Sequence, residues 1–182
     1  MIRRAAILCP GPSLTAFDDR AGHDVRIGVN RAAEAYRCDY WVALDAHTFG
    51  MCEPVGRPVL VCRTATYTKM CRRWPAAGEF EHLATNRLPG PRTRSKLRWR
   101  AYSATTALVL AAHLRSGSVD CWGVDWAGRA DFDGYTHPRQ RRDGRRWDRE
   151  RKIWTALCDL LAADGVTVAR PSADPAATRQ PA

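Results

Sequence analysis

The residues of this chain that are best suited to chemistry lie close to its N-terminus, in the segment Cys9-Pro10-Gly11-Pro12-Ser13. An apolar run, Ala5–Leu8, precedes this segment and predicts a buried strand, and Ser13 is a suitable N-cap for a short helix after it. A strand that enters a helix through a glycine-containing turn directs backbone N–H groups and the positive end of the helix dipole toward one place. We therefore predict that Gly11, Pro12 and Ser13 belong to a phosphate-binding loop, with a purely structural turn as the alternative.

Further polar residues stand at the ends of other predicted elements. Asn30, Asp45 and Asp125 each end an apolar run that is typical of a buried strand. Because the carboxyl ends of parallel strands meet at one ligand crevice, we expect these side chains to face the same nucleotide as the N-terminal loop. Ser103 and Thr105 begin a predicted helix and complete the predicted nucleotide-binding set. Asn30 is also a suitable N-cap for the helix that follows it.

The elements that must position these residues follow from the hydrophobic pattern. Short apolar runs predict strands over residues 5–8, 25–29, 40–44, 59–62, 119–125 and 166–169. Helical periodicity and capping residues predict helices over residues 13–17, 31–36, 103–114 and 149–163. This alternation predicts an α/β fold, specifically a Rossmann-like, doubly wound and mainly parallel sheet that is flanked by helices.

The domain organisation follows from length and from the segments that lack a regular pattern. The chain has 182 residues, which is close to the usual size of one domain, so we expect residues 1–170 to form a single Rossmann-like domain. Prolines, glycines and basic residues interrupt the pattern near residues 63–102 and 126–147, and we interpret both segments as irregular basic insertions. The Pro/Ala-rich residues 171–182 are expected to form a disordered tail.

The charge balance narrows the class of partner. The chain has 29 lysines and arginines against 19 acidic residues, which gives a formal net charge of +10. This excess favours a nucleotide or a phosphorylated small molecule, with nucleic acid as a further candidate and an arginine-rich solvated surface as the alternative explanation. No apolar run approaches the ~20 residues of a membrane span. The sequence carries no signal for an oligomeric state.

The cysteines point to a compartment and to the absence of a metal site. All seven are scattered, and no C-x-x-C pair occurs among them. Several lie in apolar runs, which is typical of buried free thiols. Because no signal-peptide pattern precedes the first strand, we predict a cytoplasmic protein without a bound metal.

One basic run has alternating character. Arg92, Arg94, Lys96, Arg98 and Arg100 alternate with other residues that include Leu97 and Trp99. Such a run is usually a solvated face. The alternatives are a basic loop over an anionic ligand and a nucleic-acid contact in which Trp99 stacks on a base.

Three segments together resemble the bacterial sialyltransferases that use CMP-sugar donors. Ile7–Leu14 is similar to their Gly-x-Gly-Pro-Ser-Leu loop, although Cys9 and Pro10 stand where that loop has glycine and asparagine. Ile27–Asn30 is similar to a strand that these enzymes end with asparagine. Residues 103–108 and 122–125, Ser-Ala-Thr-Thr-Ala-Leu and Trp-Gly-Val-Asp, look like their helix start and their Gly-x-Asp strand end. Related loops occur in the 6-hydroxymethylpterin diphosphokinase-like family and in uncharacterised phage proteins.

The resemblance implies a Rossmann-like domain that binds a nucleotide sugar, CMP-type among the candidates, without a required cofactor or metal. It implies that Gly11, Ser13, Asn30 and Ser103 line the donor site. It also implies a general base on the acceptor hydroxyl, for which His137 is the candidate, and a tyrosine that assists the leaving phosphate, for which Tyr135 is the candidate. Imidazole titrates near neutral pH and suits this role. A neighbouring group of arginines could stabilise the departing phosphate: Arg139, Arg141 and Arg142.

The leading interpretation is therefore a small, glycosyltransferase-like nucleotide-binding transferase that moves a sugar or related group. A pterin-type diphosphokinase is the first alternative. It would use ATP and Mg²⁺, with Asp45, Asp125 and Asp131 as the available carboxylates. A non-catalytic, basic nucleic-acid-binding module is the second, and it would use the arginine-rich segments 92–100 and 139–151.

Overall fold

The computed structural model of the chain describes residues 3–90, 97–126, 130–136 and 144–170. At its centre lies a sheet in the order β5-β4-β3-β2-β1-β6-β7, in which every neighbouring pair is parallel. The strands are β1 (Arg3–Leu8), β2 (Val25–Val29), β3 (Tyr40–Val42), β4 (Val59–Cys62), β5 (His82–Ala84), β6 (Ser116–Trp122) and β7 (Thr167–Ala169). The predicted Rossmann-like, doubly wound fold is confirmed, and the sheet is parallel throughout.

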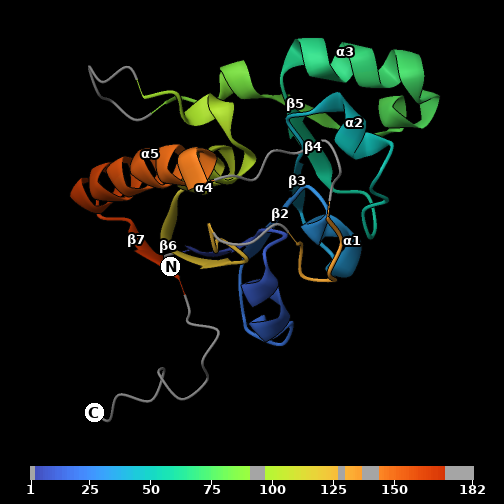
Figure 1. Ribbon diagram of the computed structural model, residues 1–182. Coiled ribbons are helices and arrows are strands. Elements are labelled where there is room, and N and C mark those ends of the chain that lie inside the picture. The colour runs from blue at the N-terminus through green and yellow to red at the C-terminus, as the bar shows by residue number, and fades with distance from the viewer. Residues whose placement is uncertain (1–2, 91–96, 127–129, 137–143, 171–182) are drawn as a thin grey trace.

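Helices cover both faces of this sheet. The α-helices are α1 (Ala32–Ala35), α2 (Ala46–Phe49), α3 (Thr64–Arg73), α4 (Ser103–His113) and α5 (Gly144–Ala163). Short 3₁₀ helices are η1 (Pro12–Ala16), η2 (Pro75–Glu79), η3 (Thr85–Arg87) and η4 (Trp99–Ala101). Figure 1 shows α4 and α5 together on one face, with η1 and α1 on the other. None of the helices in the described part of the chain has the length and apolar character needed to cross a membrane.

Successive side chains of β1 point to opposite faces of the sheet, and apolar side chains must be buried on both faces. Ala5 to Leu8 are all 0% exposed, as expected for a central strand of a parallel sheet. Ile7 packs in the cluster that includes Leu108 of α4 and Leu157 of α5. Its neighbour Leu8 points to the opposite face, in the cluster that contains Leu14 of η1. A single apolar run therefore joins the two helical layers.

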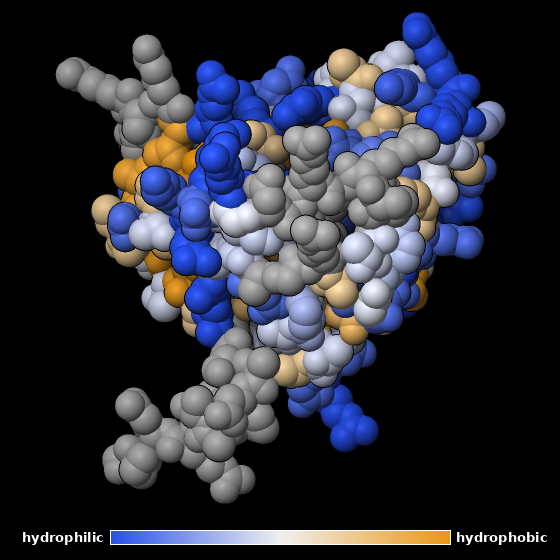
Figure 2. Space-filling model, in the orientation of Figure 1, coloured by the Kyte–Doolittle hydropathy of each residue, from blue (hydrophilic) through white to orange (hydrophobic). Residues whose placement is uncertain are grey.

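The outer surface is correspondingly polar. Figure 2 shows hydrophilic residues over much of the visible face, together with residues of intermediate hydropathy and a group of apolar residues at its left edge. Among the described residues, the large apolar side chains that are classed as exposed are Val55 and Tyr135, at 43% and 37%.

The segment 63–102 is more regular than we predicted from its composition. It contains α3, in which Met70 is the one buried residue, and the three-residue edge strand β5. A helix with one deeply buried residue and a strand of three residues leave little hydrophobic periodicity to detect. Trp99 is 6% exposed and packs in the main core, so it is not available to stack on a base as the nucleic-acid alternative for this run requires. Residues 91–96, with Arg92, Arg94 and Lys96, lie outside the described part.

The second predicted insertion, 126–147, is also shorter than expected. The helix α5 starts at Gly144 rather than at Arg149. Its first turn is rich in arginine and tryptophan, which hid it from a search for an apolar stripe. Residues 127–129, 137–143 and the predicted tail at 171–182 lie outside the described residues.

Strand order places a ligand crevice between β1 and β6. From β1 the chain builds β2, β3, β4 and β5 in one direction and then crosses through α4 to add β6 and β7 on the other side. The two strands end together, with Leu8 paired to Trp122. In open parallel sheets, ligands bind outside the carboxyl ends of the strands at the point where the order reverses.

Candidate functional site

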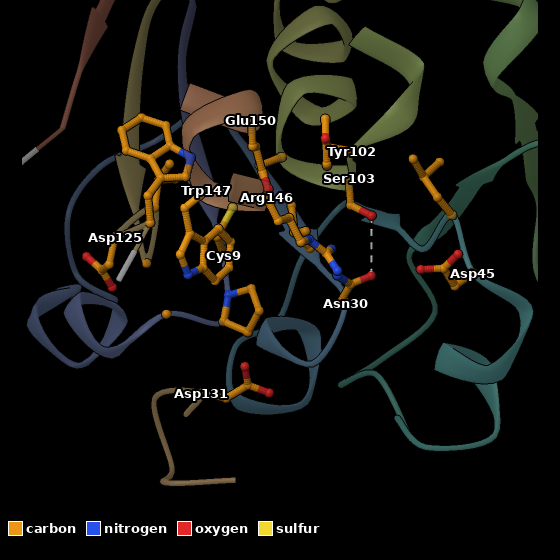
Figure 3. Close-up of a pocket in the computed structure, with 18 of the residues that line it drawn as sticks. Cys9, Asn30, Asp45, Tyr102, Ser103, Asp125, Asp131, Arg146, Trp147 and Glu150 are labelled. Carbon is orange, nitrogen blue, oxygen red and sulfur yellow. Dashed lines mark hydrogen bonds between the residues drawn. The ribbon is translucent and has the colours of Figure 1, made fainter. Parts of the chain in front are cut away.

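A pocket opens at this reversal point. The cavity volume is about 110 Å³, and the empty space is about 800 Å³ when the part open to solvent is counted. Residues at the carboxyl ends of β1, β2, β3 and β6 form one side of it. The first turns of α4 and α5 form another side, and the turn around Asp131 contributes a third (Figure 3).

Most of the predicted nucleotide-binding residues meet in this pocket. Gly11, Asn30, Asp45, Ser103 and Asp125 all line it, although they are spread over more than a hundred positions of the chain. The predicted convergence of strand ends therefore describes the geometry of this part of the fold. The nucleotide itself stays a prediction at this point.

Three predicted residues have other surroundings. Ser13 is not among the residues that line the pocket, and its Oγ accepts a hydrogen bond from the backbone N–H of Gly123 at 2.9 Å. Pro12 is the first residue of η1. Thr105 is 0% exposed, and its Oγ1 donates to the carbonyl oxygen of Tyr102 at 3.0 Å, so it stabilises the start of α4 from within the core.

Three backbone N–H groups of the turn after β1 donate hydrogen bonds to the end of β6 and the turn that follows it. Cys9 N–H donates to the carbonyl of Trp122 at 2.8 Å, and Gly11 N–H donates to the carbonyl of Gly123 at 3.1 Å. Ser13 N–H donates to Oδ2 of Asp125 at 2.9 Å. These bonds fix the mouth of the crevice.

These hydrogen bonds change the expected chemistry of the N-terminal loop. We predicted that its backbone N–H groups would hold a phosphate, but the N–H groups of Cys9, Gly11 and Ser13 already have acceptors in the protein, and that of Leu14 donates to the carbonyl of Gly11 at 3.0 Å. Prolines at positions 10 and 12 have no N–H to offer. A phosphate in the pocket must therefore be held by other groups.

Asn30 joins the end of β2 to the start of α4. Its backbone has φ 49°, a left-handed conformation that asparagine adopts more readily than most residues. Two backbone contacts hold it there, because its N–H donates to Val42 and its carbonyl accepts from the Trp41 indole, each at 3.0 Å. Its side-chain Oδ1 lies 3.5 Å from Oγ of Ser103 (Figure 3). The expected N-cap role is wrong, because Arg31 occupies the N-cap of α1.

Two helices direct their N-termini toward the pocket. Ser103 begins the 11-residue α4, and Arg146 and Trp147 lie in the first turn of the 20-residue α5. The first N–H groups of a helix have no acceptor within it, and the helix dipole adds positive potential at this end. Arg146 adds a full positive charge. These are the groups that best suit an anionic ligand here.

The pocket also contains carboxylates. Asp131 is 4% exposed and Glu150 is 8% exposed, and both line the pocket together with Asp45 and Asp125. The described residues contain no group of three or more His, Cys, Asp or Glu side chains that is arranged to hold a metal ion. Within that part of the chain, the three aspartates that the diphosphokinase alternative requires do not gather around one metal position.

Cys9 is a buried thiol at the bottom of this site. Burial raises its pKa well above the ordinary value, and the negative charges of Glu150 and Asp125 raise it further. Because the thiolate rather than the thiol is the reactive form, Cys9 is unsuited to act as a nucleophile.

Of the two predicted catalytic residues, Tyr135 lies within the described part of the chain and His137 lies outside it. Tyr135 does not line the pocket. Its ring lies under the guanidinium of Arg31, at 4.3 Å, and its side chain is exposed to solvent. His137, Arg139, Arg141 and Arg142 lie outside the described residues.

Sequence reasoning missed the residues that α5 contributes. Arg146, Trp147 and Glu150 line the pocket, and none was a predicted site residue. The spacing of Trp147, Glu150 and Trp154, at i, i+3 and i+7, is the signal that could have found the extra turns of this helix.

Comparisons with known proteins agree with this fold. No family model and no curated protein sequence matches the chain. Among solved structures, the chain is similar to the sialyltransferase CstII from Campylobacter jejuni in complex with a substrate analogue, CMP-3FNeuAc. The TM-score is 0.56 at 11% sequence identity, and the match covers 93% of this chain and 81% of that one. This likeness concerns the fold. It agrees with the fold that the resemblance to sialyltransferases implies, and it adds no support for the diphosphokinase or phage part.

Proposed function

We propose that the chain is a small glycosyltransferase-like enzyme that binds a nucleotide sugar, of CMP type, in the pocket between β1 and β6. The observation that carries this proposal is the convergence of Gly11, Asn30, Ser103 and Asp125 with the N-termini of α4 and α5 at one place. The similar sialyltransferase structure holds a CMP-sugar analogue, which supports the choice of nucleotide.

The phosphate of the donor would lie at the start of α4. Ser103 and Asn30 meet there through their side chains, and the first N–H groups of the helix face the same position. Arg146 lines the same pocket and supplies a positive charge. The turn after β1 would contribute shape rather than hydrogen bonds, because its N–H groups are already bonded.

The proposed reaction is transfer of the sugar to an acceptor hydroxyl. The hydroxyl oxygen forms a bond to the anomeric carbon, the bond between that carbon and the phosphate oxygen breaks, and the nucleoside monophosphate leaves. We assign His137 as the base that accepts the proton of the hydroxyl, and we assign stabilisation of the departing phosphate to Arg139, Arg141 and Arg142. Tyr135 is left out of this assignment because it does not line the pocket. Pocket-lining residues stand on both sides of this segment, Asp131 before it and Arg146 after it, which supports the assignment.

A nucleotide panel tests the proposal. We expect CMP to raise the melting temperature by about 5–10 °C when present at roughly a hundred times its dissociation constant. UMP, GMP and AMP serve as comparisons, and ATP with Mg²⁺ is included because a diphosphokinase requires both. Absence of any shift at millimolar nucleotide would refute the proposal, and a selective response to ATP with Mg²⁺ would favour the diphosphokinase.

Asn30→Gly probes the position assigned to the phosphate. Glycine adopts the left-handed φ of this position without strain, so the variant loses the side-chain amide and keeps the backbone. We expect CMP to bind about 10-fold more weakly, which is the usual effect of losing one hydrogen bond to a charged group. Isothermal titration calorimetry measures the affinity.

A matched control is available for this substitution. Arg115 also has a left-handed backbone, with φ 60°, and it lies between α4 and β6 at the opposite end of the strands. Arg115→Gly should leave the affinity for CMP unchanged. Equal affinity of Asn30→Gly and the unmodified protein would show that Asn30 does not contact the ligand.

A further inference from the structure

The turn over residues 130–136 places a buried carboxylate at the wall of the pocket. Asp131 is 4% exposed, and aspartate is seldom buried to this extent unless it is paired, as Asp131 is with Arg31 at 3.5 Å. It lines the pocket, and Figure 3 shows its carboxylate at the side opposite the labelled residues of α5. A carboxylate kept at the wall of a ligand pocket is a candidate for recognising part of the ligand.

Backbone hydrogen bonds fix this turn in place. Phe132 N–H donates to the carbonyl of Pro10 at 2.7 Å, which attaches the turn to the segment after β1. Asp131 N–H donates to the carbonyl of Tyr135 at 2.8 Å, and this bond closes the turn on itself. The position of Asp131 is therefore set by the same loop that forms the mouth of the crevice.

Arg31 holds the turn from the side of β2. Its guanidinium donates two hydrogen bonds to the Asp133 carboxylate, at 2.6 and 3.1 Å, and lies 3.5 Å from Oδ2 of Asp131. The hydrogen bond to Asp133 raises the pKa of Arg31 and lowers the pKa of Asp133, so both groups stay charged. Arg31 directly follows Asn30, so the end of β2 positions both the pocket-facing amide and this carboxylate.

The chemistry of a carboxylate limits what it can recognise. It accepts hydrogen bonds and repels a phosphate, so it suits the neutral part of a nucleotide. The neutral donors of a cytidine nucleotide are the ribose hydroxyls and the amino group of the base. Because the phosphate is assigned to the start of α4, the wall that carries Asp131 is left for one of these groups.

We propose that Asp131 accepts a hydrogen bond from the ribose 2′-hydroxyl or the base amino group of the donor nucleoside, and that Arg31 acts as its positioning residue. This inference rests on the proposed function, because it assumes that a nucleotide occupies the pocket. It makes Asp131 a determinant of nucleotide specificity that lies outside the segments of the family resemblance.

Calorimetric titration with CMP, 2′-deoxy-CMP and UMP tests the inference and identifies the group. We expect the unmodified protein to bind CMP about 10-fold or more tightly than one of the two analogues. Weaker binding of 2′-deoxy-CMP than of CMP identifies the ribose 2′-hydroxyl as the donor, and weaker binding of UMP than of CMP identifies the base amino group. This comparison uses the unmodified protein, so it does not depend on the folding of a variant.

Asp131→Asn then connects the preference to this side chain. We expect it to weaken CMP binding about 10- to 100-fold while binding of the discriminating analogue stays unchanged. Asp164→Asn, at an exposed aspartate just after α5, is the control and should bind all three nucleotides as the unmodified protein does. Asp131→Asn that retains the full preference for CMP would overturn the inference.

Arg31→Lys tests the positioning role through a double-mutant cycle. If Arg31 acts through Asp131, its effect on the preference for CMP should disappear when Asp131→Asn is already present. Independent, additive effects would overturn the positioning role. If CMP, 2′-deoxy-CMP and UMP bind equally well, the inference fails and the proposed function stands. If none binds, both fail.

Discussion

Gly123→Ala should destabilise the protein by about 3 kcal/mol or more, which is a large fraction of the stability of a domain of this size. A Cβ at this position would lie 1.8 Å from the backbone carbonyl oxygen of Cys9. The backbone φ of 69° is also unfavourable for alanine. Relief would require the turns after β1 and β6 to separate, and this would break the hydrogen bond from Gly11 to Gly123. Urea denaturation followed by circular dichroism measures the loss.

Gly165→Ala separates the steric effect from the effect of backbone conformation. Gly165 has a similar φ of 79°, but a Cβ there would meet nothing within 4 Å. We expect a loss of only about 1 kcal/mol, from the left-handed backbone alone. Equal losses for the two variants would show that the close approach at Gly123 relaxes at little cost. Gly11→Ala provides a third point, because its Cβ would lie 2.5 Å from the carbonyl oxygen of Gly123.

The close packing of these two turns also explains why the sequence predicts a glycine loop but not its chemistry. The pattern of strand, glycine and helix start is the same whether the backbone N–H groups face a ligand or another loop of the protein. Here the partner of Gly11 is Gly123, more than a hundred residues away, and its carbonyl takes the N–H that a phosphate would otherwise use. Local sequence carries no information about such a partner.

The predictable part of the fold is the part that buries regular apolar runs. Each residue of Ala5–Leu8 is fully buried, and the run stands out in the sequence for that reason. The start of α5 is different, because its first turns face the pocket and carry Arg146, Trp147 and Glu150 in place of an apolar stripe. Helix positions that line a ligand site carry polar side chains where the helical pattern would have apolar ones. Hydrophobic periodicity therefore fails to detect such turns.

Positions at strand ends were the most informative about the site. Asn30, Asp45 and Asp125 line one pocket because a parallel sheet brings the carboxyl ends of its strands to one edge. Asp131 and Arg31 could not be paired in the same way, because their contact depends on how one turn docks on another. Topology thus predicts which strand ends meet, whereas contacts between loops require coordinates.

His137→Ala should lower the turnover of a CMP-sugar by about 10²- to 10⁴-fold, the range expected when a general base is removed. The imidazole would accept the proton of the acceptor hydroxyl as its oxygen attacks the sugar. Binding of CMP should change little, because the base is assigned to the acceptor rather than to the nucleotide. Chromatographic measurement of CMP release gives the rate, and calorimetry gives the affinity.

The pH profile distinguishes loss of a base from general damage. In the unmodified protein, the rate should fall at low pH as the histidine becomes protonated, and this limb should be absent from the residual rate of His137→Ala. His113→Ala, at an exposed histidine in the last turn of α4, is the control and should keep both the rate and the profile. If His137→Ala turns over at the unmodified rate, the proton must go to another acceptor. The buried carboxylate of Glu150, which lines the same pocket, is then the next group to replace.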